Sequence, residues 1–137
     1  MIISETKDLD KIYNIFCDPE IYDRIGDDGA PSVDEFEAVP PSDSVYYLTD
    51  EENIGLVFYH WKNCVTLEGH IQVLKRYRHR AIEFGELALK WAWDNTDARK
   101  IVVTIPEIYP DVIKFVTKFG FEIDGLCVFL FILHFDF

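Results

Sequence analysis

One stretch of the chain, residues 64–94, constrains the fold most, because its periodicity changes from that of a strand to that of a helix. From Val65 to Leu74, apolar and polar residues alternate, which is typical of a strand with one face turned to the core. Beyond residue 80, the apolar residues recur three and four positions apart, which predicts an amphipathic helix over 81–94. A basic run, KRYRHR over 75–80, joins the two segments. The sequence therefore predicts a strand, a basic loop and a helix in direct succession.

The basic run indicates a place where an anion could bind. The first turn of a helix has unpaired N–H groups and a partial positive charge, and phosphate groups bind there readily. The chain as a whole has a formal net charge of −12, so a run of this sign stands out. Two interpretations stay open from these residues alone. The run is either a phosphate-binding loop or a solvated loop that balances nearby carboxylates.

Composition limits the class of protein. A chain of 137 residues, 49% of them hydrophobic, predicts a single folded domain over 1–137. We expect neither a membrane span nor a signal peptide, because no apolar run is long enough and the start is not basic. Three widely spaced cysteines favour buried thiols in the cytoplasm over disulfides or a metal site. The acidic balance argues against nucleic acid as a partner and suits a cationic amine.

The remaining segments predict a mixed sheet. Short turns join strands over 44–49, 54–62 and 65–74 into an antiparallel meander. The helix over 81–94 then leads to a β-branched strand over 100–105. A strand–helix–strand unit of this kind forms a right-handed crossover and makes its two strands parallel. The expected class is α+β, with a mostly antiparallel sheet that contains one parallel pair.

The two ends of the chain lead to separate expectations. Thr6 is expected to cap the first helix, whose apolar face begins at Leu9. The final run, Leu126 to Phe137, is nearly all apolar and has no obvious turn. It is either one long strand that pairs between subunits or a hairpin with a cryptic turn. An exposed strand of this composition would aggregate, so we expect it to be covered, and a homodimer through this region would cover it.

Two groups of residues resemble the GNAT superfamily of acyl-CoA-dependent N-acetyltransferases. In that family, a strand leads through a loop of pattern Gln/Arg-x-x-Gly-x-Gly/Ala into a long helix. The run Arg78-His79-Arg80-Ala81-Ile82-Glu83 stands at the corresponding place, with departures at Ala81 and Glu83. The segment Phe119-Gly120-Phe121 is similar to the family's late signature. The resemblance implies a central mixed, mostly antiparallel sheet with a splayed parallel pair, flanked by about four helices.

The resemblance also implies acetyl-CoA as a cosubstrate. In the family, the cofactor lies where the central strand and the next parallel strand splay apart, and the amides of the loop hold its pyrophosphate. Gln72, Val73 and Leu74 correspond to the backbone that binds the pantetheine arm. The pyrophosphate loop corresponds to residues 76–82, and its expected cofactor-binding residues are Arg76, Arg78, His79, Arg80, Ala81 and Ile82.

The central strand carries the candidate general base. Glu68 lies where the family often places such a group, and His70 is the competing base or a partner. The two residues share one strand face about 6.6 Å apart, close enough to share a water or a substrate. For the general acid, family members commonly have a tyrosine where this chain has Val116. Tyr109, near the same end of the sheet, is the remaining candidate.

Two functional hypotheses follow. The first is a cytoplasmic N-acetyltransferase that acetylates a primary amine on a small molecule or a protein. The second is a non-catalytic GNAT-fold protein for binding or assembly. The chain is similar to small GNAT-like proteins encoded by bacteriophages, some of which are associated with head assembly, and would then act in the host cytoplasm. Nucleic-acid binding through residues 75–80 ranks last, because the rest of the chain would repel phosphate.

Overall fold

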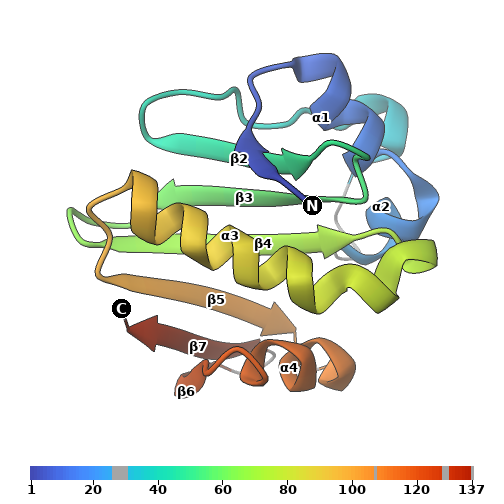
Figure 1. The fold of residues 1–137 in the computed structure, drawn as a ribbon. Helices are drawn as coiled ribbons and strands as arrows, with labels where there is room; N and C mark the ends of the chain where they lie inside the picture. The colour runs from blue at the N-terminus through green and yellow to red at the C-terminus, as the bar shows by residue number, and fades with distance from the viewer. Residues whose placement is uncertain (26–30, 107, 128–129, 137) are drawn as a thin grey trace.

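The computed structural model describes residues 1–25, 31–106, 108–127 and 130–136, and within them the chain forms a seven-stranded sheet (Figure 1). The strands are β1 (Ile3–Glu5), β2 (Val45–Asp50), β3 (Gly55–Trp61), β4 (Thr66–Val73), β5 (Lys100–Pro106), β6 (Glu122–Cys127) and β7 (Leu130–Asp136). Their order across the sheet is β1-β2-β3-β4-β5-β7-β6. Strands β4 and β5 are parallel, and the other neighbouring pairs are antiparallel.

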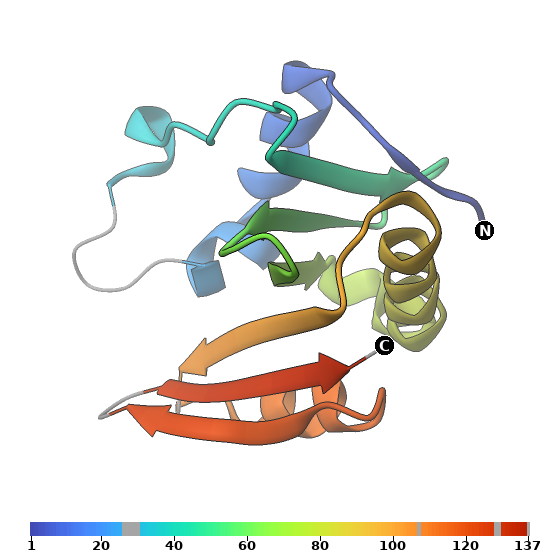
Figure 2. The ribbon, with the colours of Figure 1, turned by 90° about the vertical axis from the view of Figure 1, so that its left-hand side faces the viewer.

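Helices cover both faces of the sheet (Figure 2). They are α1 (Leu9–Phe16), α2 (Pro19–Ile25), α3 (Ala81–Asn95) and α4 (Pro110–Thr117), with short 3-10 helices η1 (Val33–Glu35) and η2 (Lys75–Arg80). Helices α1 and α2 lie on one side, and α3 and α4 lie on the other. This arrangement confirms the predicted fold class, a mostly antiparallel mixed sheet with one parallel pair between helical layers.

Two buried clusters hold the helices against the sheet. Phe84 and Ala88 of α3 are buried against Tyr59 of β3 and Ile101 of β5. The Tyr59 hydroxyl donates a hydrogen bond to the Ala88 carbonyl oxygen at 3.0 Å, which satisfies the polar end of this buried ring. Full burial of a phenylalanine side chain such as that of Phe84 contributes about 1.5–3 kcal/mol to the stability of the fold. On the opposite face, the second cluster contains Ile12, Ile15, Ile21, Val45, Tyr47, Leu56 and Leu74.

The alternation predicted for the central strand is confirmed in β4. Leu67 is fully buried in the cluster beneath α3. His70 lies on the other face, where its ring contacts that of Phe58. The crossover through α3 is also confirmed, since it returns the chain to a β5 strand parallel to β4. The sequence periodicity therefore fixes which β4 side chains are available for chemistry.

Two local predictions are wrong. The residue that caps α1 is Asp8, whose side chain accepts hydrogen bonds from the N–H groups of Asp10 and Lys11. Thr6 lies two residues earlier, and its hydroxyl oxygen accepts a hydrogen bond from the Asp8 N–H. The basic run is not an open loop but the 3-10 helix η2, which continues directly into α3. Tight turns of this kind are frequent at helix starts, where they satisfy backbone groups that the α-helix leaves free.

The C-terminal run forms the hairpin alternative, and the single long strand is wrong. Strand β6 pairs with β7, and β7 lies between β5 and β6. The predicted turn cannot be compared with the structure, because residues 128 and 129, which join the two strands, lie outside the described residues. Since β7 has a neighbour on each side, its backbone is satisfied within the chain. A homodimer through this region stays a prediction.

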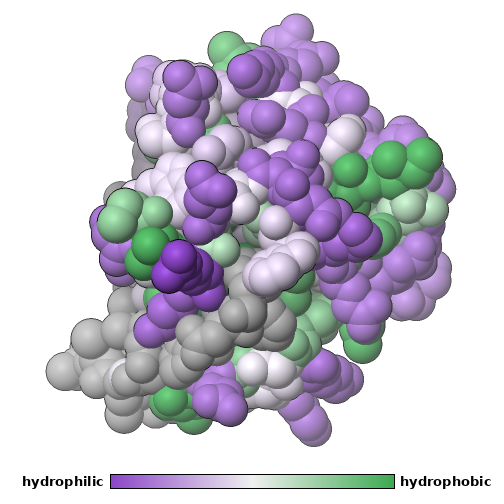
Figure 3. All heavy atoms as spheres, turned by 60° about the vertical axis from the view of Figure 1, so that its left-hand side comes forward, coloured by the Kyte–Doolittle hydropathy of each residue, from purple (hydrophilic) through white to green (hydrophobic). Residues whose placement is uncertain are grey.

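The surface is largely polar on the side shown in Figure 3, where hydrophobic side chains form small separate groups. Among the described residues, no helix has both the length and the apolar composition to cross a membrane.

Candidate active site

A cleft opens where β4 and β5 stop pairing. The two strands are paired at three positions only, which end at Glu68 opposite Val102. Beyond this point β4 stays with β3 as far as Val73, whereas β5 stays with β7 as far as Pro106. The two halves of the sheet separate, and a cavity of about 370 Å³ lies between them.

The lining of this cleft is mostly apolar with a few polar groups, a combination typical of ligand sites. Residues 69–73 of β4 and 103–106 of β5 form the two strand walls. The helices contribute Glu20, Arg78, Ala81, Tyr109, Asp111, Val112, Phe115 and Val116. The cleft therefore contacts the start of α3, as the expected cofactor site does.

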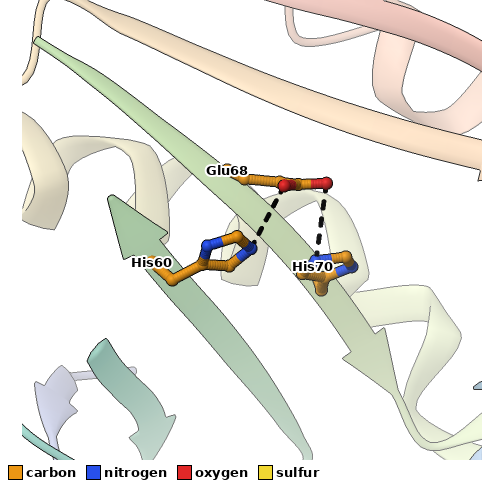
Figure 4. Close-up of side chains that lie close together, drawn as sticks. All are labelled: His60, Glu68 and His70. Atoms are coloured by element: carbon orange, nitrogen blue, oxygen red, sulfur yellow. Dashed lines mark ion pairs between the residues drawn. The ribbon is translucent and has the colours of Figure 1, made fainter. Parts of the chain in front are cut away.

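His60, Glu68 and His70 come together beside the cleft (Figure 4), and we call them the His–Glu–His cluster. The register of β3 and β4 places His60 opposite Glu68, so all three side chains share one face of the sheet. Nε2 of His60 lies 3.1 Å from Oε2 of Glu68, and Nε2 of His70 lies 3.9 Å from Oε1. The two imidazole rings are nearly parallel, with centroids 5.9 Å apart.

Glu68 is the centre of the cluster, and its side chain is only 14% exposed. The Thr104 hydroxyl donates a hydrogen bond to Oε1 of Glu68 at 3.2 Å. Nζ of Lys62 lies 3.7 Å from Oε2. These partners compensate the charge of a part-buried carboxylate. Thr104 belongs to β5, so its bond reaches across the point where the two strands separate.

His70 is the member of the cluster that lines the cleft. Burial lowers the pKa of His70 below its ordinary value, the Glu68 carboxylate raises it in part, and His60 lowers it again. His70 is therefore mainly neutral at pH 7. A general base must be unprotonated to act, so His70 and Glu68 together fit that role.

The predicted cofactor-binding residues do not all reach the cleft. Gln72, Val73, Arg78 and Ala81 line it. Leu74 is buried in the cluster beneath α1 and α2, so its side chain belongs to the core. The remaining residues of the set are exposed or paired elsewhere, with His79 and Ile82 on the exposed side of the segment.

Two arginines of the basic run have carboxylate partners within the chain. The Arg76 guanidinium lies 3.2 Å from Oε2 of Glu20, and the Arg76 backbone N–H donates to the same oxygen at 3.4 Å. Arg80 pairs with Glu52 at 3.1 Å. For these two arginines the charge-balancing interpretation of the run is confirmed. A phosphate bound here would compete with Glu20, which also lines the cleft.

The structure also places the residues that depart from the family pattern. Val116 lies in the cleft wall but has no group that could donate a proton. Tyr109 lies in the same wall, at the start of α4, and has a phenol that can. Glu83 pairs with the Met1 ammonium group at 3.9 Å.

Sequence reasoning missed the residues that surround Glu68 from other strands. His60 could have been found from the hairpin turn, where the Asn63 side chain accepts from the N–H groups of Val65 and Thr66. Residues 60 and 68 are equally far from residue 64, so they face each other across the hairpin. Thr104 gave no such signal, because its position depends on tertiary packing, and the same holds for Glu20 of α2 in the cleft lining.

Comparisons with known proteins support the fold. No family model matches the chain, and no curated protein matches it. Several solved structures do, and most of those named are N-acetyltransferases.

The spermidine N-acetyltransferase from Vibrio cholerae, in complex with CoA and spermine, has a TM-score of 0.75 at 15% identity over 98% of this chain and 94% of that one. Smu.2055 from Streptococcus mutans has a TM-score of 0.69 at 14% identity over 99% of both chains. The Campylobacter jejuni N-acetyltransferase PseH, in complex with acetyl coenzyme A, has a TM-score of 0.63 at 11% identity over 69% and 70%. At these identities the likeness establishes the fold alone, which is GNAT-like.

Proposed function

We propose that the chain is an acyl-CoA-dependent N-acetyltransferase that transfers the acetyl group of acetyl-CoA to a primary amine. The observation that carries the proposal is the cleft between β4 and β5, which brings His70 into the same space as the start of α3. Holding two reactants beside a base is itself a large part of catalysis. Proteins of this fold have been solved with CoA or acetyl coenzyme A, which supports the choice of cosubstrate.

In the proposed reaction, the amine nitrogen attacks the thioester carbon, so that a C–N bond forms and the C–S bond breaks. His70 accepts the proton of the amine, and Glu68 orients its imidazole and stabilises the imidazolium that forms. The backbone of β4 beyond Glu68 no longer pairs with β5, so it can bind the pantetheine arm and the carbonyl oxygen. Tyr109 is the candidate that returns a proton to the departing thiolate.

The acceptor we propose is a cationic amine. The whole chain has a net charge of −12, so its overall field favours a positive substrate. The Vibrio cholerae enzyme is named for spermidine and was solved with spermine. Polyamines are therefore the first compounds to test, followed by a peptide that contains lysine.

A second candidate is a non-catalytic GNAT-fold protein for binding or assembly. The ion pairs of Glu20 with Arg76 and of Glu52 with Arg80 favour it, because two arginines that could bind a phosphate are already paired with carboxylates. Such a protein would require neither acetyl-CoA nor an amine.

Release of free CoA thiol distinguishes the two candidates. With acetyl-CoA and a panel of spermidine, spermine and a lysine peptide, we expect thiol release that depends on one class of amine. Mass spectrometry should show an acceptor that has gained one acetyl group. If acetyl-CoA binds but no amine raises thiol release above that of the buffer, the enzyme proposal is contradicted and the second candidate stands.

A further inference from the structure

The His–Glu–His cluster has a composition that its role as a base does not require. Two imidazoles converge on one carboxylate, and each presents its Nε2 atom (Figure 4). One ligand atom from each of the three residues lies within 4.8 Å of the others. A base needs one such group, or a pair, whereas three converging donors of this kind are typical of a metal site.

The spacing of these donors fits a small divalent ion. In a tetrahedral zinc site with bonds of about 2.0–2.1 Å, neighbouring ligand atoms lie about 3.3 Å apart. His60 Nε2 lies 3.1 Å from Oε2 of Glu68, which matches this spacing, whereas His70 Nε2 lies 3.9 Å from the other oxygen, Oε1. Rotation of the carboxylate and of the His70 ring is therefore needed to bring one oxygen and both nitrogens around a single ion. Two imidazoles and one carboxylate suit zinc and its first-row neighbours, whereas calcium and magnesium prefer oxygen ligands.

We propose that His60, Glu68 and His70 bind one divalent transition-metal ion, with zinc the best match. The site has three protein ligands and lies beside the cleft, so the remaining position is open to water or a substrate. Thr104 supports the site from β5, because its hydrogen bond to Glu68 orients the carboxylate as outer partners of metal ligands do.

Lys62 is the group that opposes a cation here. Its Nζ lies 3.7 Å from Oε2 of Glu68, so its ion pair with this carboxylate competes with metal binding. The Lys62 side chain is 46% exposed on a flexible stem, so it can move into water when the ion binds. The proposal therefore predicts that Lys62→Gln binds the metal more tightly than the unaltered chain.

Metal binding would also regulate the reaction, and this part alone rests on the proposed function. An ion bound to Nε2 of His70 uses the only lone pair of the neutral imidazole and leaves the ring proton on Nδ1, so the ring can no longer accept the proton of the amine. Zinc should therefore inhibit acetyl transfer, and a chelator should restore it. Binding itself can be measured in the absence of acetyl-CoA, so a failure of the acetyltransferase proposal would leave the metal proposal open to its own test.

The test is a titration of the full chain with Co²⁺, followed by visible absorption, and competition with Zn²⁺ by calorimetry. We expect one ion per chain, and at least about a tenfold loss of affinity in His60→Asn, His70→Asn and Glu68→Gln. His79→Asn is the matched control, since His79 is exposed on η2 and lies outside the cluster. All titrations use a Cys64→Ser background, because Cys64 is an exposed thiol that could bind zinc by itself.

Circular dichroism of each variant shows whether it remains folded, and Glu68→Gln preserves the size of the side chain if a histidine variant does not fold. The absence of saturable binding at millimolar metal would overturn the proposal. So would equal affinities in Glu68→Gln and His79→Asn, because the bound ion would then lie elsewhere.

Discussion

Glu68→Gln and His70→Asn should each lower kcat for acetyl transfer by about 10²–10⁴-fold, the usual contribution of a general base. His70 lines the cleft and is mainly neutral at pH 7, and Glu68 lies 3.9 Å from its Nε2 atom. Glutamine preserves the shape of Glu68 but cannot stabilise an imidazolium. Because the two residues move one proton together, the kcat of the double variant should be only a little lower than that of the less active single variant. Steady-state release of CoA thiol measures all three.

The control for this series is Glu86→Gln, which makes the same change in an exposed glutamate of α3 outside the cleft and should leave kcat within about twofold. Thermal unfolding of each variant excludes a general loss of structure. Full activity in both Glu68→Gln and His70→Asn would show that neither residue accepts the proton.

Gly55→Ala should lower the free energy of unfolding by about 3 kcal/mol, at the upper end of the usual cost of overpacking. A Cβ atom at Gly55 would lie 2.4 Å from the carbonyl oxygen of Gln72. That oxygen belongs to the backbone of β4, so the clash is relieved only if β3 and β4 move apart. For a domain of this size, the midpoint of thermal unfolding should fall by about 10 °C.

Gly85→Ala is the matched comparison, because its Cβ would also be crowded, at 2.6 Å from Cζ of Phe119. That atom is the far end of a side chain, which can rotate away, and alanine favours the helix by about 1 kcal/mol. The change in stability should therefore stay within about 1 kcal/mol. If Gly55→Ala is as stable as Gly85→Ala, the close packing of β3 against Gln72 is not as described.

The central unit of the fold could be predicted from the sequence because its periodicity is clear. The alternation in 65–74 and the helical spacing after residue 80 match β4 and α3 to within a residue. The β-branched strand β5 could also be predicted, because a helix that follows a strand returns the chain to a parallel neighbouring strand. In this segment the local sequence pattern agrees with the global fold, so its secondary structure can be predicted from the sequence.

The C-terminal hairpin could not be decided from the sequence. The run from Leu126 to Phe137 has no alternating period, and it lacks the glycine or proline that marks most turns. Strand β7 lies between β5 and β6 through pairing that no local pattern in the run indicates. The sequence alone is compatible with both conformations, and the strand order decides between them.

The candidate site was predictable only along β4. Glu68 and His70 share a face because side chains alternate, and this needs no tertiary information. His60 and Thr104 join them through the pairing of β4 with its two neighbours. The pairing of Arg76 with Glu20 links residues far apart in the chain, so the charge of the basic run was visible but its partner was not.

The most direct test of the proposed function is thermal unfolding with and without acetyl-CoA. At about a hundred times its dissociation constant, a ligand should stabilise the fold by roughly 2.7 kcal/mol, which raises the midpoint by about 5–10 °C. Arg78→Ala should reduce this shift, because Arg78 lines the cleft, whereas Arg99→Ala, at the opposite end of β5, should preserve it. The absence of any shift at millimolar acetyl-CoA would contradict an acyl-CoA site in this cleft.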